Sequence, residues 1–530
     1  MLFLNYLNFL KYTYENLKNK NKNKNNIILV EVSFNIFPLV GIIFLIKALT
    51  NIYQSKIIFY YPKINHSYFD VFKTFAKLCN NIKSILIFLV LGARLNLCFV
   101  NNKIKSNAKN KFKEIINNVN SKEELLCLKL EGIEVGDLFY DNYLRQNAKH
   151  TIEIDSKFKQ ILLCYIIDFY YWYDFFNKHN VKCIIISHTV YNPAIPLRIG
   201  QARLIISYIA SINFIERFDS NRKTIMQSKY RNSFNTLSNE KKVRALLNAK
   251  KILEDKFEGI HNLTEQRGYG SNPEIRKNLS IAQLETFGKN ENNKKEIFKK
   301  NGKLNVLIMA HCFYDAPHAD GKFLFTDFYE WINHLGKLSN ETDYNWFIKK
   351  HPHSVEKKLN DKTIERIVLK YPKIQLLNEN VTNNEILNDE VSLVLTVHGS
   401  PGYEFSYHEI PVILGSNNTS YENYNICYQP KNIKAFDDAI KNFSDMIFPF
   451  DKNEILKYYY NLHLAFWNLI PAEEYNKIVR GGKTFKSTPL EHESQLYKYI
   501  SAKIRKKTFT NKIIEIENFI KNKDYRLFSK

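Results

Sequence analysis

The sequence predicts an α/β protein built from two doubly wound domains that face each other across a cleft. At 530 residues the chain is too long for one hydrophobic core, and with 45% hydrophobic residues it can bury two. Short apolar runs alternate along the chain with segments of helical spacing. Several of these runs are apolar without interruption, which is typical of parallel strands buried on both faces.

The first series of elements is expected within residues 27–234. The predicted strands are "NIILVEVSF" (26–34), "SKIIFYYP" (55–62) and "VKCIIISHT" (181–189). Helical spacing is found at 37–54 and at 157–179, whereas "KSILIFLVLGA" (83–93) fits either a helix or a strand. The alternation indicates a βαβ domain.

A second βαβ series is expected within 303–450, after a charged helical connection and polar linker at 235–302. Its predicted strands are "LNVLIMAH" (304–311), "NWFIKKHP" (345–352), "KIQLLN" (373–378), "VSLVLTV" (391–397) and "IPVILG" (410–415). Helices are predicted between them and again at 431–447. This domain therefore repeats the architecture of the first.

The two ends of the chain are basic. Residues 1–26 contain "KNKNKNN" and are predicted to form a disordered arm. Residues 451–530 are predicted to form C-terminal helices with a basic tail. The apolar spacing of this tail at Ile513, Ile514, Ile516 and Phe519 suits either a solvated helix or an anionic membrane surface.

The formal charge of +23 does not by itself predict nucleic-acid binding. Lys, Asn, Ile, Phe and Tyr are all abundant, as expected from AT-rich codons, and the aromatic-plus-basic motifs of nucleic-acid-binding modules are missing. The seven cysteines are dispersed without a CxxC pair, which favours reduced thiols. The segment "MLFLNYLNFLKYTYEN" lacks the features of a secretory signal, and the apolar stretch at 34–49 is too short to span a bilayer. We therefore expect a cytoplasmic protein that can lie peripherally against the inner membrane.

Ligands of open α/β sheets bind beyond the carboxyl ends of parallel strands, so polar residues at those positions are the candidates. His351 follows one predicted strand and is held extended by the proline behind it. Its imidazole can donate to a phosphate oxygen, and Lys350 can add positive charge. A histidine that merely donates to a backbone carbonyl is the alternative.

The segment "VHGSPGYEFSYHEIPVILGS" (397–416) is predicted to be a phosphate-binding turn. Gly399, Ser400 and Gly402 let backbone amides approach an anion at the start of a helix. His398 precedes the turn, and Glu404 is placed to hold a ribose or sugar hydroxyl. An ordinary strand–helix turn is the alternative.

Two further groups follow predicted strands. His311, Asp315 and His318 lie in a segment that either closes over a donor substrate or, less in keeping with known zinc spacings, holds a metal in a hydrolase. His188 at the end of 181–189 suits either a general base or a core-edge histidine, and Asp141 either a base or a carboxylate that satisfies backbone donors. No metal site is predicted.

Five segments resemble a family of bacterial capsule and surface-polysaccharide biosynthesis proteins, related to the capsular β-Kdo transferases and more distantly to sialyltransferases and glycerophosphotransferases. They are "VGDLFYDNYLR" (135–145), "SHTVY" (187–191), "AHCFYDAPH" (310–318), "IKKHPHS" (348–354) and "VHGSPGYEFSYHEIPVI" (397–413). The resemblance covers residues 27–450 and is firmest over 303–425.

The resemblance implies a GT-B fold, with an acceptor domain at 27–234 and a nucleotide-sugar domain at 303–450. It implies that His351 contacts the donor phosphate and that Ser400, Gly402 and Glu404 form the donor turn. It identifies no acceptor-side base, so His188, Asp141 and Asp315 are catalytic candidates by position.

The sequence thus predicts a glycosyltransferase that moves a sugar from a nucleotide-activated donor to a polysaccharide or lipid-linked acceptor, without a cofactor or metal. Electrostatic stabilisation of the leaving phosphate would carry the reaction. The alternatives are a non-catalytic module for polysaccharide binding or export with the same shape, and a glycerophosphotransferase-like enzyme.

Overall fold

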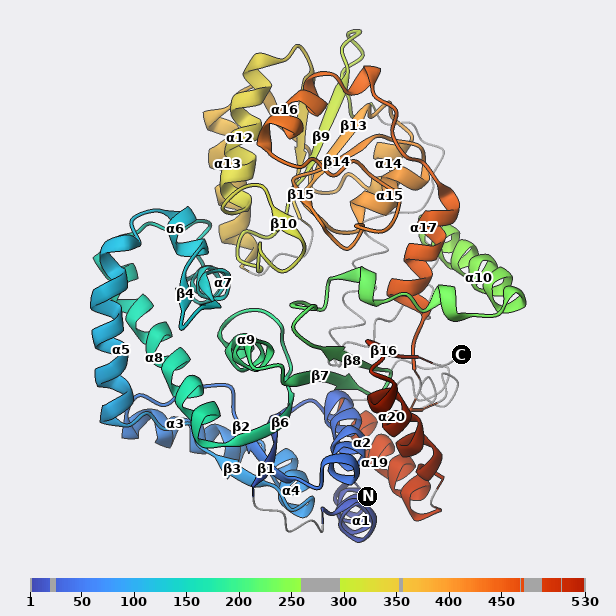
Figure 1. Ribbon diagram of the computed structural model, residues 1–530. Coiled ribbons are helices and arrows are strands. Elements are labelled where there is room, and N and C mark those ends of the chain that lie inside the picture. Colours follow the sequence, from blue (N-terminus) through green and yellow to red (C-terminus); the bar gives the residue numbers. More distant parts are fainter. Residues whose placement is uncertain are drawn as a thin grey trace.

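The protein forms two Rossmann-like domains, each built on its own sheet (Figure 1). The computed structural model describes residues 2–19, 25–258, 296–351, 356–467, 469–470, 489–506 and 508–528. The strands at the centre of both sheets are parallel and buried on both faces, as their uninterrupted apolar runs predict. The predicted α/β architecture of two doubly wound domains is confirmed.

The first domain has a seven-stranded sheet in the order β16-β8-β7-β6-β1-β2-β3. Its strands are β1 (Asn26–Glu31), β2 (Lys56–Tyr60), β3 (Arg94–Asn96), β6 (Asn180–Ile185), β7 (Ile206–Ser211), β8 (Phe214–Phe218) and β16 (Arg526–Leu527). The five strands from β3 to β7 are parallel, and β8 and β16 add an antiparallel edge. Strand order reverses between β1 and β6, which makes this pair the topological switch point.

Helices cover both faces of the first sheet because successive side chains of β1 point to opposite sides. Ile28 and Val30 pack with one helical layer and Leu29 with the other. The first layer contains α1 (Leu2–Leu17), α2 (Ile36–Tyr53), α4 (Ile82–Val90), α19 (Pro489–Arg505) and α20 (Thr510–Asn522). The second contains α5 (Asn102–Ile115), α7 (Gly136–Asn147), α8 (Ser156–Lys178) and α9 (Ile195–Ala202).

Short elements complete the first domain. They are α3 (Tyr68–Asn80), α6 (Lys122–Leu126) and the small hairpin of β4 (Lys129–Leu130) and β5 (Ile133–Glu134). The stretch 83–93, which fits either element by sequence, is largely the helix α4. Within the described residues, α2 is the helix long and apolar enough to cross a membrane, but 67% of it is buried inside the protein, as in a core helix.

The second domain has a five-stranded, entirely parallel sheet in the order β12-β11-β9-β13-β14. Its strands are β9 (Asn305–Met309), β11 (Asn345–Lys349), β12 (Ile374–Leu376), β13 (Leu393–Thr396) and β14 (Val412–Leu414), and a small ladder joins β10 (Lys322–Phe323) to β15 (Ser416–Asn417). The chain runs from β9 to β11 on one side and returns to β13 on the other, so the switch point lies between β9 and β13.

Two helical layers also cover the second sheet. One contains α12 (Phe328–Glu341), α13 (Lys357–Lys370) and α16 (Ile433–Lys441). The other contains α10 (Asn239–Phe257), α14 (Asn383–Leu387), α15 (Pro401–Tyr407) and α17 (Lys452–Tyr459), which a π-helical turn extends through Tyr460–Leu464. The connecting segment 235–302 therefore contributes α10 to this core, and its residues 259–295 lie outside the described ones.

The prediction of a disordered arm over 1–26 is wrong for most of its length. Residues 2–17 form α1, which packs on α19 and buries Tyr6 and Phe9. Strand β1 already begins at Asn26. Residues 20–24 of the basic run lie outside the described residues.

The C-terminal segment packs on the first domain and is not a solvated tail. Helix α20 packs against α2 and buries Ile516 and Phe519, two of the residues that suggested a membrane-facing stripe. Strand β16 then pairs with β8 at the edge of the first sheet. The end of the predicted 451–530 region thus belongs to the first domain (Figure 1).

Candidate functional site

Three histidines stand at the carboxyl ends of three adjacent strands in the second domain. His351 follows β11, His311 follows β9, and His398 follows β13, in the order in which the strands lie in the sheet. The rings of His311 and His398 are 4.9 Å apart. His351 is half-buried and close enough to His311 to act on its pKa. The residues after it, 352–355, lie outside the described ones.

His311 is held as a neutral imidazole at the switch point. Burial, and then the neighbouring His398 and His351, keep its pKa well below the ordinary value of 6.5. Its Nε2 accepts a hydrogen bond from the Val397 amide at 3.2 Å, and its ring stacks on Phe328 at 4.7 Å. These contacts fix the ring, and because Nε2 accepts, the proton of the neutral form is on Nδ1.

His398 presents an unused polar atom at the same place. Its Nδ1 is buried and has no hydrogen-bond partner within the described part of the chain. Burial lowers the pKa of His398 to about 4, and Asp315 and His318 also act on it. A buried polar atom without a partner is rare in proteins, so this nitrogen is a candidate contact for a ligand.

The glycine turn after β13 is tightly packed from behind. Gly399 has φ +116°, a conformation that favours glycine, and its carbonyl accepts a hydrogen bond from the Tyr421 hydroxyl. A Cβ on Gly402 would come within 2.7 Å of the same Tyr421 ring. Ser400 is half-buried before α15 and makes no capping hydrogen bond. A tight glycine turn thus follows β13 as predicted, and its phosphate-binding role stays a prediction. Helix α15 after it has only seven residues.

His318 and Asp141 form a buried pair across the two domains. His318 Nδ1 lies 2.5 Å from the Asp141 carboxylate, which belongs to α7 of the first domain. Burial favours the neutral imidazole, but Asp141 outweighs it and raises the pKa of His318. The Nε2 of His318 is buried and, among the described residues, has no partner. Asp141 is therefore positioned to orient His318 and not to take a proton from a substrate.

Asp315 also joins the two domains. Its carboxylate accepts a hydrogen bond from the Tyr191 hydroxyl at 2.8 Å and lies 3.5 Å from the Arg145 guanidinium. Both partners belong to the first domain and line its pocket. The segment predicted to close over the donor substrate thus contacts the predicted acceptor domain.

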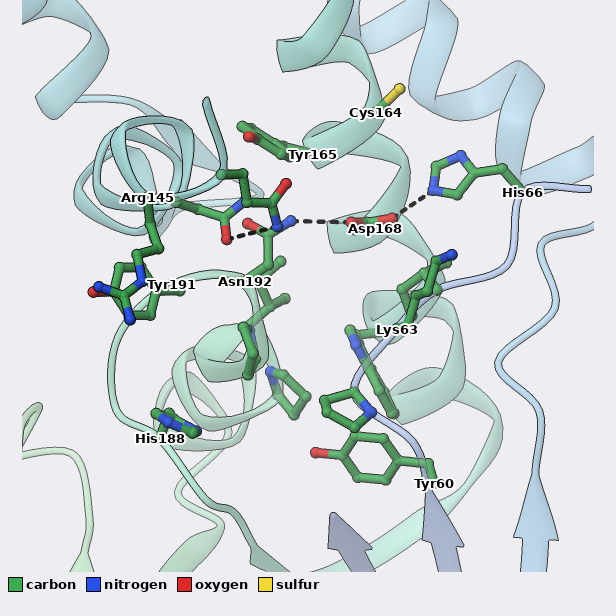
Figure 2. A pocket seen from close by; sticks show the side chains of 18 of the residues that line it. Tyr60, Lys63, His66, Arg145, Cys164, Tyr165, Asp168, His188, Tyr191 and Asn192 are labelled. Atoms are coloured by element: carbon green, nitrogen blue, oxygen red, sulfur yellow. Dashed lines mark hydrogen bonds and ion pairs between the residues drawn. The ribbon is translucent and has the colours of Figure 1, made fainter. Parts of the chain in front are cut away.

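The first domain contains a pocket of 520 Å³ beyond the ends of β2 and β6 (Figure 2). Aromatic side chains line it, including Tyr165, Trp172 and Tyr191, together with the polar groups of Lys63 and Arg145. Flat apolar rings next to a few convergent polar groups are typical of a site for a small polar ligand such as a sugar. The pocket lies against the domain interface, because Arg145 and Tyr191 are shared with Asp315.

His188 lines this pocket and is oriented by a buried carboxylate that the sequence did not reveal. Ser187 Oγ lies 2.6 Å from His188 Nδ1, and the same hydroxyl contacts the Glu31 carboxylate. Glu31 ends β1 and His188 follows β6, so the group sits at the switch point of the first sheet. Burial raises the pKa of Glu31, and this increase is larger than the lowering caused by His188 and Ser187. Because the Ser187 hydroxyl donates to Glu31, it accepts from His188 Nδ1, so the carboxylate sets the tautomer of the histidine through the serine.

Two predicted donor residues have other partners. Lys350 lies 2.7 Å from Glu365 on α13. Glu404, which was expected to hold a sugar hydroxyl, is 3% exposed and lies 2.9 Å from Lys256 of α10. Glu404 therefore attaches α15 to α10. The prediction that Glu404 holds a sugar hydroxyl is wrong, because its carboxylate is buried against Lys256.

The group of His311, Asp315 and His318 does not converge as a metal-hydrolase site would require. His318 faces Asp141, and Asp315 faces Tyr191. Over the described ranges, no three His, Cys, Asp or Glu side chains lie close enough together to hold a metal ion. Asp315 and His318 act instead as contacts between the domains, whereas His311 packs within the second domain.

No family model matches the chain, and no curated protein is significantly similar to it in sequence. Solved structures similar to it include UDP-GlcNAc 2-epimerase from Neisseria meningitidis bound to UDP-GlcNAc (9% identity, 82% of this chain and 97% of that chain, TM-score 0.23). Another is S. aureus MnaA with UDP (10% identity, 83% of this chain and 91% of that chain, TM-score 0.24). A further one is the wall teichoic acid polymerase TagF with CDPG (9% identity, 96% of this chain and 97% of that chain, TM-score 0.22). At TM-scores this low, the likeness decides neither the fold nor the function of this chain.

Proposed function

We propose that the protein is a glycosyltransferase that uses a nucleotide-activated sugar and works at the interface of its two domains without a metal. The observation that carries the proposal is the meeting of two sheet switch points: the histidine group of the second domain and the pocket of the first share the Asp315–Arg145–Tyr191 contact. Switch points are where open α/β sheets bind ligands. The sequence resemblance to surface-polysaccharide transferases supports the same reading.

The second-domain histidines would bind the donor phosphates. His398 Nδ1 and His318 Nε2 are both buried without a partner in the described chain, so a phosphate would satisfy both. Asp141 raises the pKa of His318, which favours the protonated ring, and a protonated ring would stabilise charge that develops on the leaving phosphate. His351 would add a further donor from the neighbouring strand.

His188 would act as the general base toward the acceptor. Its Nδ1 is engaged by Ser187, which leaves Nε2 for a proton from an acceptor hydroxyl in the pocket. Glu31 stabilises the positive charge that the ring would then carry. A polysaccharide or lipid-linked glycan is the acceptor we propose, with a sugar residue in the aromatic pocket.

Nucleotide binding tests the proposal directly. The full-length protein is heated with CMP, UDP and GDP and with their sugar derivatives, and one nucleotide series is expected to raise its Tm. A ligand at a hundred times its Kd stabilises the folded state by about 2.7 kcal/mol. His398→Ala should abolish this increase. The matched control is His334→Ala, because His334 is paired with Asp437 on the outer helices of the same domain.

The outcomes separate the alternatives. If no nucleotide raises the Tm, the glycosyltransferase assignment is refuted and a non-catalytic polysaccharide-binding module is favoured. If CDP-glycerol rather than a nucleotide sugar is turned over, the chain is a glycerophosphotransferase-like enzyme. If His334→Ala loses the nucleotide-induced increase in Tm as completely as His398→Ala does, the histidine group is not the donor site.

A further inference from the structure

Helix α3 presents an aromatic stripe to solvent. Tyr68, Phe69, Phe72 and Phe75 are 82%, 64%, 68% and 54% exposed, while only Thr74 and Leu78 of this helix are buried. Tyr68, Phe72 and Phe75 recur at the spacing that normally marks the core-facing side of a helix. Here that spacing marks the side facing away from the domain, so the stripe is not explained by the fold.

The exposed apolar surface continues over two neighbouring helices. Helix α4 packs against both α3 and α1, and all three lie along the lower edge of the first domain in Figure 1. Helix α4 exposes Ile82 and Leu89. Helix α1 buries Tyr6 and Phe9 but exposes Phe3, Leu4, Leu7 and Tyr14. Half of the large hydrophobic side chains that are exposed in the described residues belong to these three helices, which is a concentration that marks an interaction surface.

Lysines flank the stripe and indicate an anionic partner. Lys73 and Lys77 are exposed on α3 beside the aromatic side, and the Lys73 ammonium lies 4.2 Å from the centre of the Phe69 ring. Lys103 is exposed at the start of α5, four residues after Phe99 in the sequence, and the Phe99 ring is 5.1 Å from that of Tyr68. Aromatic rings bordered by lysines match the headgroup region of an anionic bilayer, and the lysines would repel a second copy of the same surface.

We propose that α1, α3 and α4 dock on the surface of an anionic lipid bilayer, with the aromatic stripe of α3 in the headgroup layer. The C-terminal tail, for which the sequence left a membrane contact open, is not the docking surface, because Ile516 and Phe519 of α20 are buried and the helix packs against α2. The proposal does not depend on the transferase activity. It is consistent with it, since Lys63, His66 and Asp70, in and just before α3, line the pocket of the first domain.

Vesicle co-sedimentation with the full-length protein tests the proposal. The wild type is expected to pellet with vesicles of phosphatidylglycerol and phosphatidylcholine, and less so with phosphatidylcholine alone or at high salt. The triple variant Phe69→Ser, Phe72→Ser, Phe75→Ser should bind about tenfold more weakly, because the apolar area inserted in the interface is lost. The matched control, Leu204→Ser, Leu369→Ser, Ile447→Ser, removes apolar residues elsewhere that are even more exposed, and it should bind like the wild type.

A fluorescent reporter gives an independent readout. The four tryptophans of the chain, Trp172, Trp331, Trp346 and Trp467, are all buried. In Phe72→Trp, brominated lipids should therefore quench the new indole, whereas in Leu369→Trp they should not.

Several results would overturn the proposal. One is a wild type that stays in the supernatant with anionic vesicles, and another is an α3 triple variant that pellets as well as the wild type. A third is concentration-dependent self-association on size exclusion that the α3 variant abolishes, which would identify the surface as an interface between copies. An unquenched indole in Phe72→Trp would contradict the docking orientation even if the serine variant failed to fold. Nucleotide-induced increases in Tm should be the same in all variants, so failure of this proposal is distinguishable from failure of the proposed function.

Discussion

Replacing Glu216 by Gln should weaken the junction between the first sheet and the C-terminal strand. Glu216 on β8 is buried and contacts the guanidinium of Arg222, while Arg231 lies 3.0 Å and Arg526 of β16 3.7 Å away. Burial alone would raise its pKa, but the three arginines outweigh it and lower the pKa from 4.5 to about 2. A shift of this size corresponds to about 3 kcal/mol in favour of the ionised form in the folded protein.

The glutamine variant is expected to lose about 3 kcal/mol at neutral pH, since it leaves buried guanidinium groups without their carboxylate. Amide hydrogen exchange on β8 and β16 measures this loss locally, which is preferable in a two-domain chain that need not unfold in one step. Because the pKa of Glu216 is lowered on folding, its contribution is complete above about pH 4.5 and is lost as the pH falls toward 2. The difference between wild type and variant should therefore shrink on acidification.

The matched control is Glu240→Gln, which removes the carboxylate of an exposed pair with Arg244 on α10. An exposed i,i+4 pair contributes only about 0.3–0.5 kcal/mol, so exchange should hardly change. If Glu216→Gln costs less than about 1 kcal/mol, or no more than Glu240→Gln, the reasoning about this buried group is refuted.

Three further predictions concern the site. Gly402→Ala should lower the stability of the second domain by about 1–3 kcal/mol and reduce nucleotide binding, because its Cβ would displace Tyr421; unchanged nucleotide-induced Tm increases would contradict this. Glu31→Gln should lower kcat by at least about tenfold while the KM for the nucleotide donor stays the same, since it acts through His188; a changed donor KM with normal kcat would count against the base assignment. His351→Ala should leave the Tm of the free protein unchanged and reduce nucleotide-dependent turnover by at least about tenfold, and an unchanged rate would argue against a phosphate contact.

The second sheet, and β1, β2 and β6 of the first, were predictable from the sequence because strands buried on both faces appear as uninterrupted apolar runs. Strands β3, β7, β8 and β16 of the first sheet were not predicted. The positions of His311, His351 and His398 followed from the same runs, since each stands directly after one. The order of β11, β9 and β13 in the sheet then brings them together.

The groups that the sequence did not reveal depend on contacts between distant segments. Glu31 looks like a polar end to an apolar run until β1 pairs with β6 and places it beside Ser187. The pairing of Asp141 with His318 joins residues 177 positions apart, on different domains. Helix α1 was hidden for another reason: its buried Tyr6 and Phe9 lie next to a low-complexity run that suggested disorder.

The return of the chain to the first domain determines when that domain can be complete. Its edge strand β16 and the helices beneath it are translated after the whole of the second domain. During synthesis on the ribosome, the edge of the first sheet at β8 stays unpaired until β16 has been made. Cutting the chain between the domains would consequently not release two independent halves, because one half would carry away the last strand of the other.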